Sequence, residues 1–297
     1  MKYNELYYER IDVEKRRNSM NEFLEKFSNA ESVDDQVSTI LDVNEQNKEY
    51  HSYAAIASLN FSRDINDEDA KAEKDYYDSI GPDMIEIGDS FEKAVNQSKY
   101  KDELSKKWGE KFLTDIETSL KTFDPKIKEM LKEETNLRNE YTKLTAGAKI
   151  TYEGKEYNLA GLGPFHSNED RNVRKASYEA RFNWFSENSE ALDDIYDKLV
   201  KLRHKIATTL GYDNFIELGY MRMGRSDYGP NEVANFRKQI VDHVVPVVKK
   251  LARKKKDILG LDHLYFYDGI NFKEGDPKPK GSPDHLIKEA QVMYREL

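Results

Sequence analysis

The sequence predicts a mostly α-helical protein, an elongated multi-helix body with one small β-hairpin. Charged residues make up 35% of the 297 residues, which suits amphipathic helices that have a narrow apolar stripe and a broad charged face. Aromatic residues make up 11%, so the chain carries the side chains needed for a packed core. Apolar residues also recur at helical spacing along most of the sequence.

The helical spacing predicts a series of helices in chain order. The first covers residues 12–29, and the next begins after Ser32, which forms a capping-box pattern with Asp35. Gly81 and Pro82 predict a break between two later helices. The remaining predicted helices cover residues 68–79, 82–96, 101–120, 125–145, 168–188, 189–210, 215–220, 231–259 with a kink at Pro246, and 284–297.

Residues 149–159 break the helical pattern and predict the single hairpin. Alternating apolar residues flank Glu153 and Gly154, a pair suited to a tight turn. An isolated two-stranded hairpin is marginal in water, so we expect it to pack on helices or to join strands from elsewhere in the chain. The change of pattern divides the chain into two predicted domains, a helical one at 1–147 and a second at 148–297.

Composition excludes several classes of protein. The absence of Cys removes disulfides, thiolate metal sites and a Cys nucleophile. A net charge of −9 argues against nucleic acid as a partner, because phosphate neutralisation needs clustered cations. No apolar run is long enough to predict a membrane span, and no signal-like segment opens the chain. We therefore expect a cytoplasmic location.

The sequence contains no local motif for a metal or a nucleotide. A zinc peptidase helix needs His-Glu-x-x-His, which places two imidazoles on one helix face, yet no two of the six His lie four residues apart. Glycine-rich phosphate loops are missing as well. We therefore predict no catalytic residue and no metal ligand in this chain.

The segment 218–230 is the strongest candidate for binding. It combines arginines, which capture carboxylates, with tyrosines, which offer an apolar ring and a polar tip. This composition predicts that Arg222, Arg225 and Tyr228 contact a peptide substrate. The alternative is a helix connector whose arginines pair with nearby acids.

Several stretches together resemble one family. They are NLRNEYTKL at 136–144, ITYEGKEYNL at 150–159, DRNVRKA at 170–176, GYDNFIELGYMRMGRSDY at 211–228, PKPKG at 277–281 and MYREL at 293–297. With these stretches the chain resembles the N-terminal half of an oligoendopeptidase F-type zinc peptidase, related to thimet oligopeptidase.

The resemblance implies a clam-like, mostly helical enzyme whose deep channel takes short peptides. Its zinc would be held by a His-Glu-x-x-His helix and a further Glu in the C-terminal half, so none of these residues can be assigned here. The zinc would polarise the scissile carbonyl and activate water, with the motif Glu as general base. The resemblance also places the hairpin with Tyr152 beside the cleft, where its edge could align a peptide.

These expectations define the leading hypothesis. The chain would form the channel, bind no zinc itself, be inactive alone and require the missing catalytic half as its partner. The final predicted helix has no stop signal, which predicts a truncated chain with exposed apolar surface and a tendency to associate. The alternatives are a non-catalytic helical peptide-binding or adaptor protein and a split enzyme made of two chains.

Overall fold

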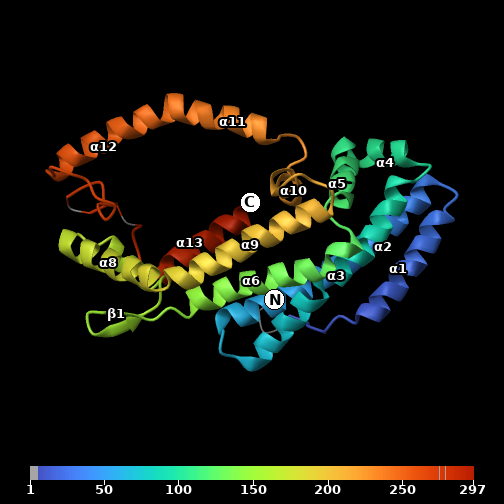
Figure 1. Ribbon diagram of the computed structural model, residues 1–297, viewed down its shortest axis with the longest axis horizontal. Coiled ribbons are helices and arrows are strands. Elements are labelled where there is room, and N and C mark those ends of the chain that lie inside the picture. Colours follow the sequence, from blue (N-terminus) through green and yellow to red (C-terminus); the bar gives the residue numbers. More distant parts are fainter. Residues whose placement is uncertain (1–5, 274, 278) are drawn as a thin grey trace. The chain divides into compact units, whose positions relative to one another are not determined.

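The computed structural model describes residues 6–273, 275–277 and 279–297 and consists mainly of helices (Figure 1). The described strands, β1 (Ile150–Tyr152) and β2 (Lys155–Tyr157), form one antiparallel pair. This confirms the predicted mostly α fold with a small hairpin. The helices, including a 3₁₀ turn η2 and a π-helical turn η3, are α1 (Val13–Ser28), α2 (Val33–Arg63), α3 (Glu68–Asn96), α4 (Lys101–Trp108), α5 (Glu110–Leu120), η2 (Pro125–Ile127), α6 (Lys128–Ala146), α7 (Gly163–His166), α8 (Arg171–Glu187), α9 (Ser189–Thr209), α10 (Phe215–Arg222), α11 (Pro230–Gln239), η3 (Ile240–Val244), α12 (Val245–Leu259) and α13 (Pro283–Glu296).

The chain forms two compact units, each made of two segments. Unit 1 comprises Met1–Ala146 and Ser189–Phe236, and unit 2 comprises Gly147–Asn188 and Arg237–Leu297. The domains predicted from the sequence, 1–147 and 148–297, divide the chain once, near the first of these boundaries. In the structure, by contrast, each unit consists of two separate segments. The reason is that α9 packs on α6, so the segment that begins at Ser189 belongs to unit 1 again.

The first core of unit 1 lies among α1, α2 and α3. Asp12 caps α1 by accepting a hydrogen bond from the Lys15 amide at 3.0 Å, and the predicted capping box between Ser32 and Asp35 is present at the start of α2. The buried apolar residues that these helices share are Met20, Phe27, Val37, Ile40, Val43, Tyr53, Ala57, Tyr77, Ile80, Met84, Ile87, Phe91 and Val95.

The predicted break at Gly81 and Pro82 is wrong, because α3 continues through both residues. Pro82 removes one backbone hydrogen bond, but apolar side chains at helical spacing on both sides remain buried in the same core, from Tyr77 to Val95. Tertiary packing of this face outweighs the local preference. Conversely, the predicted helix 101–120 is divided at Gly109, whose φ of 88° is favourable only for glycine.

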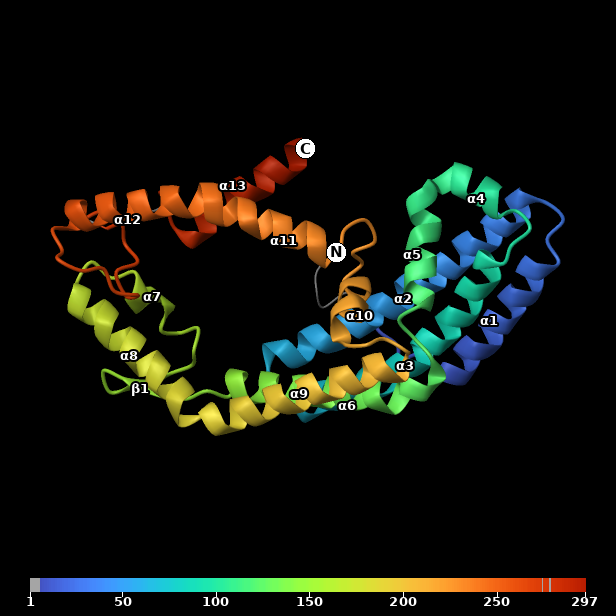
Figure 2. The same ribbon diagram turned by 45° about the horizontal axis from the view of Figure 1, so that its top comes forward.

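A second core of unit 1 lies among η2, α6, α9 and α10. Helices α6 and α9 run side by side in both views (Figures 1 and 2). Ile127, Ile206 and Leu218 are completely buried between these elements. This core fixes α10, which carries part of the candidate binding segment.

In unit 2 the hairpin packs on α8, which is the first of the two arrangements expected from the sequence. Ile150 pairs with Tyr157 across the two strands, and the turn residues Glu153 and Gly154 have φ values of 48° and 75°. Ile150 and Tyr152 are buried. The hairpin is therefore stabilised by a helix rather than by further strands.

The C-terminal helices of unit 2 leave apolar side chains exposed. The π-helical turn η3 directly precedes the proline-containing start of α12, where the sequence predicts a kink. Apart from Ala290, every residue of α13 is exposed. Within the described ranges, no helix has the length and apolarity needed to cross a membrane. Between residues 268 and 283 the described residues form no helix before Pro283.

Candidate functional site

The segment around α10 in unit 1 holds three of the four predicted substrate-binding residues, Arg222 at the end of the helix and Arg225 and Tyr228 after it. Asn214 caps α10 by accepting a hydrogen bond from the Ile216 amide at 2.8 Å. After the helix, Gly224 has a φ of 66°, and the Arg225 amide donates to the Tyr220 carbonyl at 3.1 Å. This left-handed residue at the helix end reverses the chain and fixes the position of Arg225.

Arg222 belongs to a buried ionic cluster. Its guanidinium donates to Glu134 at 2.7 Å, and Arg203 donates to the other Glu134 oxygen at 2.7 Å. Only 4% of the Glu134 side chain is exposed. Both guanidinium groups also lie over the Phe215 ring, 5.7 and 5.6 Å from its centroid. For Arg222, therefore, the alternative expectation applies, in which the arginine pairs with a nearby acid.

The electrostatics of Glu134 agree with this geometry. Burial alone would raise the pKa of the carboxyl group, because it disfavours the charged form. The hydrogen bond from Arg203 and the charge of Arg222 outweigh burial, so the net pKa lies below its ordinary value. Glu134 is thus ionised at neutral pH and holds α6, α9 and α10 together.

Arg225 has a different environment. Its guanidinium lies 5.0 Å from the centroid of the Tyr220 ring and 5.6 Å from that of Tyr228. Among the residues that the structure describes, no carboxylate lies within 4.0 Å of it. Tyr228 is 43% exposed. The structure therefore brings Arg225 and Tyr228 together as a cation between aromatic rings, with charge available for an anionic group.

Tyr152, the fourth predicted residue, belongs to unit 2 and is only 8% exposed. Its hydroxyl donates to the Val173 carbonyl at 3.3 Å, and its ring packs against Phe165 with centroids 4.9 Å apart. Burial raises the pKa of its hydroxyl. In this conformation Tyr152 anchors the hairpin on α8.

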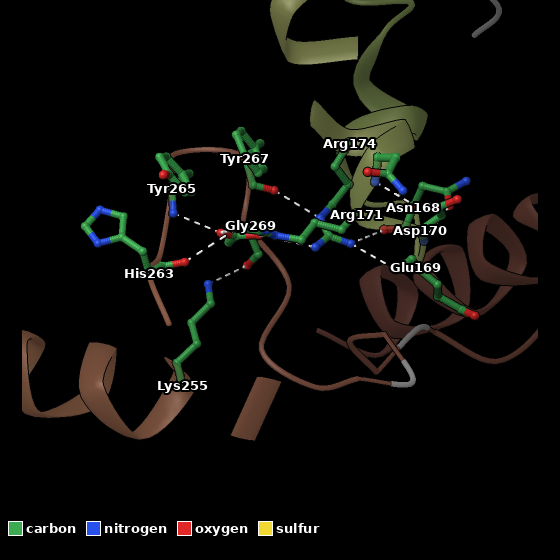
Figure 3. A network of polar contacts seen from close by, with 12 residues as sticks. Asn168, Glu169, Asp170, Arg171, Arg174, Lys255, His263, Tyr265, Tyr267 and Gly269 are labelled. Atoms are coloured by element: carbon green, nitrogen blue, oxygen red, sulfur yellow. Dashed lines mark hydrogen bonds and ion pairs between the residues drawn. The ribbon is translucent and has the colours of Figure 1, made fainter. Parts of the chain in front are cut away.

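Unit 2 contains a polar network that the sequence analysis missed (Figure 3). Arg171 donates to both carboxylate oxygens of Asp268, at 2.8 and 2.9 Å, and the Asp268 side chain is completely buried. Arg174 lies 3.5 Å from the same carboxylate and donates to the Tyr267 carbonyl at 3.0 Å. The Tyr265 amide donates to Asp268 at 2.8 Å.

This network fixes the start of α8 to the segment around Asp268. The hydrogen bond from Arg171, opposed by burial, holds the pKa of Asp268 below its ordinary value. Because its two carboxylate oxygens are used by partners in the protein, Asp268 is suited to a structural role. The signal in the sequence was an acid directly after the aromatic run Tyr265, Phe266 and Tyr267.

The side chains present do not fit a zinc site. Throughout the described ranges, no three His, Asp or Glu side chains lie together in a way that could hold a metal ion. Zinc in proteins takes at least three such ligands when Cys is absent. The part of the chain that the structure describes therefore offers no set of side chains for the metal centre that the resemblance implies.

Comparisons with known proteins identify the family. The profile of the peptidase M3 N-terminal domain matches residues 3–123, and that of peptidase family M3 matches residues 165–284. The chain belongs to peptidase family M3. Members of this family are generally zinc-dependent. No curated protein matches the sequence.

Solved structures of peptidases match almost the whole chain. A structure designated oligoendopeptidase F is 38% identical, with a TM-score of 0.95 over 100% of this chain and 53% of its own. PZ peptidase A, solved with an inhibitor, is 39% identical, with a TM-score of 0.95 over 99% of this chain and 53% of its own. A structure from Bacillus anthracis that is designated oligoendopeptidase F is 36% identical, with a TM-score of 0.93 over 99% of this chain and 54% of its own. The chain thus spans about half the length of the structures it matches, which confirms the predicted resemblance to an N-terminal part.

Proposed function

We propose that this M3 peptidase chain forms the channel part of a zinc-dependent oligoendopeptidase that hydrolyses short peptides, and that it is inactive by itself. The observation that carries the proposal is the match of nearly the whole chain to about half of each oligoendopeptidase structure. The described side chains offer no cluster that could hold zinc, which agrees with a zinc site in the remaining part of the enzyme. Zinc, when bound by the remaining part, would supply Lewis-acid activation of the peptide bond.

Exposed apolar surface supports a large partner for unit 2. Large apolar residues are exposed along η3 and α12, and those from Val241 to Leu251 lie mostly three or four positions apart. The full set is Val241, Val244, Val247, Val248, Leu251 and Ile258, with exposed fractions of 38–61%. Such a face is characteristic of an interface, and we propose that the remaining part of the enzyme covers it.

The binding residues have separate roles in this proposal. Arg225, set between Tyr220 and Tyr228, would attract a carboxylate of the peptide. Arg222 would act indirectly, because its guanidinium is held by Glu134. Tyr152 would position the hairpin, whose outer edge would pair with an extended peptide through backbone hydrogen bonds. A cytoplasmic location completes the proposal.

The proposal is tested by a cleavage assay with an internally quenched oligopeptide. The 297-residue chain with added zinc is expected to show no cleavage above buffer. Addition of the C-terminal half of an oligoendopeptidase F, as a separate chain, is expected to bind and to give chelator-sensitive cleavage. Chelator-sensitive cleavage by the chain alone would contradict its inactivity. If the chain binds the peptide but no cleavage occurs, either with the chain alone or after addition of the C-terminal half, the adaptor alternative is favoured instead.

A further inference from the structure

A cavity of about 380 Å³ lies in unit 1, among α2, α3, α6 and the end of α10. Cavities of about 300 Å³ and above are large enough for small ligands. Tyr50, Ile85 and Leu131 give it an apolar wall. Ile85 is 48% exposed, so this wall is open to a ligand. Arg225 does not line the cavity, which is therefore separate from the site assigned to that residue.

The ionic groups at this cavity leave an excess of positive charge. Asp78 forms an ion pair with Lys74. Glu134 accepts hydrogen bonds from both Arg203 and Arg222, so one carboxylate meets two guanidinium groups. Of these residues, all but Arg203 line the cavity. Their charges disfavour a metal cation and favour an anionic group.

Arg138 adds a cation that has no partner. It lies four residues after Glu134 on α6, is exposed and lines the cavity. Among the described residues, no carboxylate pairs with its guanidinium and its side chain makes no hydrogen bond. Its donors are therefore free to bind a carboxylate through two parallel hydrogen bonds. Tyr50 also has a hydroxyl without a partner in the described ranges, and burial raises its pKa, so it remains protonated and can donate.

Helix α3 offers a backbone acceptor to the same cavity. Pro82 has no N–H group, so the carbonyl of Asp78, four residues earlier, loses its helical donor. Both residues line the cavity, and no side chain in the described part of the protein donates to that carbonyl. Gly81 has no side chain to cover it, and a Cβ atom added there would meet nothing within 4 Å. This carbonyl is therefore available to an N–H group of a ligand.

The free acceptor and the free cation belong to helices that touch at this point. Asn139, the residue after Arg138, donates to the Asp78 carboxylate at 2.7 Å. An extended peptide rises about 3.3 Å per residue, so its terminal carboxylate and its last two N–H groups fall within about 7 Å. Two residues of a peptide are thus enough to reach from one helix to the other where their side chains are in contact.

We propose that this cavity binds the carboxyl-terminal end of a peptide whose last residue is apolar. The carboxylate of the peptide lies on Arg138, and one of its last two N–H groups donates to the Asp78 carbonyl. The apolar side chain packs on Ile85 and Leu131. An inorganic anion would leave both the apolar wall and the carbonyl acceptor unused. The proposal is independent of peptide hydrolysis, because it concerns binding to this chain alone.

Isothermal titration calorimetry of the full 297-residue chain with N-acetyl-leucyl-leucine tests the proposal. One molecule is expected to bind per chain. The corresponding carboxamide, which has no terminal charge, is expected to bind at least about tenfold more weakly, a difference of about 1.4 kcal/mol. The absence of binding heat at about 10 mM peptide would overturn the proposal, as would equal affinity for the carboxamide.

A variant of the exposed arginine locates the carboxylate. Arg138→Gln is expected to weaken binding of N-acetyl-leucyl-leucine about tenfold and to reduce the preference over the carboxamide to within about twofold. Lys143→Gln removes the same charge from an exposed position of α6 that does not line the cavity, and it is expected to leave binding unchanged. Unchanged binding and preference in Arg138→Gln would place the peptide elsewhere.

A proline variant tests the backbone contact. Pro82→Ala restores an N–H donor to the Asp78 carbonyl. Wild type is expected to prefer N-acetyl-leucyl-leucine over its analogue methylated on both amide nitrogens, and Pro82→Ala is expected to reduce that preference at least about threefold. Pro230→Ala, at the first position of α11, is the control and should keep the wild-type preference. An equal preference in Pro82→Ala and wild type would contradict the contact. If Pro82→Ala fails to unfold cooperatively, Arg138→Gln decides.

Discussion

Glu134 of α6 and Arg222 of α10 form a 2.7 Å ion pair in which the carboxylate is almost completely withdrawn from solvent. Arg203 of α9 donates a hydrogen bond to the other carboxylate oxygen of Glu134. A residue of the candidate binding segment is therefore tied to the second core of unit 1. Stability and binding can be separated by mutation because Arg225, three residues further on, has no such tie.

Replacement of Glu134 by Gln should destabilise unit 1, because two arginines lose their common carboxylate. Breaking a buried ion pair from one side costs about 3–5 kcal/mol, and the partial exposure of both arginines reduces the expected loss to about 2–3 kcal/mol. Urea unfolding followed by circular dichroism measures this change. Glu129→Gln, on the same helix with an 85% exposed side chain, is the control and should change stability by less than about 0.5 kcal/mol. Equal effects of the two variants would contradict the structural role of Glu134.

Acid should destabilise the chain through Asp268 and Glu134. Both carboxyl groups have folded-state pKa values below their ordinary ones, so the unfolded state binds more protons as the pH falls. The stability that they contribute is complete above the unfolded pKa values of about 4 and is lost as the pH falls through the folded values. Urea midpoints measured from pH 7 to pH 3 should decrease below about pH 5.

The Asp268→Asn variant tests whether Asp268 causes the decrease of the urea midpoint at low pH. It should be less stable at pH 7 and should lose less stability on acidification, because its side chain does not titrate. Asp284→Asn, on the exposed α13, should keep the wild-type slope. Parallel pH profiles for wild type and Asp268→Asn would exclude a contribution from the network.

Truncation of Ile206 to Ala should destabilise the second core of unit 1. Ile206 is completely buried, and loss of a buried isoleucine side chain costs about 2–5 kcal/mol. Ile216→Ala, whose side chain belongs to a residue that is 58% exposed on α10, should cost less than about 1 kcal/mol. Thermal and urea unfolding of both variants provide the comparison, and similar losses would show that this core is not packed as described.

Removal of the Arg225 charge should affect peptide binding more than folding. In the complete enzyme, Arg225→Gln should raise KM about tenfold with a smaller effect on kcat, because binding to the ground state and to the transition state is lost together. Its unfolding midpoint should remain that of wild type. Arg222→Gln should instead lower the midpoint, since it leaves Glu134 with one partner. An unchanged KM in Arg225→Gln would remove this residue from the proposed site.

Zinc and chelators should not change the stability of the chain. A metal that binds only the folded state raises the melting temperature by mass action, and the described side chains offer no cluster for such binding. Differential scanning calorimetry with equimolar zinc and with excess chelator should give the same midpoint within error. An increase of several degrees with zinc, reversed by the chelator, would reveal a metal site.

Helical periodicity was sufficient to predict most helices, the spacing of Ser32 and Asp35 predicted the capping box, and the alternating residues around Glu153–Gly154 predicted the hairpin. It failed at Pro82, where burial of the α3 face overrides a local breaker, and at Gly109, where one left-handed residue divides a periodic segment. The two buried carboxylates could not be recognised from spacing alone, because their arginine partners lie 69 to 97 residues away in sequence. The sequence did contain one indication for Glu134, because its spacing from the apolar residues Ile127 and Leu137 places it on the same helix face as these buried residues.

The discontinuous composition of unit 1 has a consequence for synthesis on the ribosome. Its second core needs Ile206 and Leu218, which emerge only after the hairpin and α8 have been made. During that interval the side of α6 that packs on α9 has no native cover, although α3 is already present, and it is open to chaperones or to wrong pairing. Slow translation between residues 147 and 189 would therefore lengthen the time during which this side of α6 is uncovered.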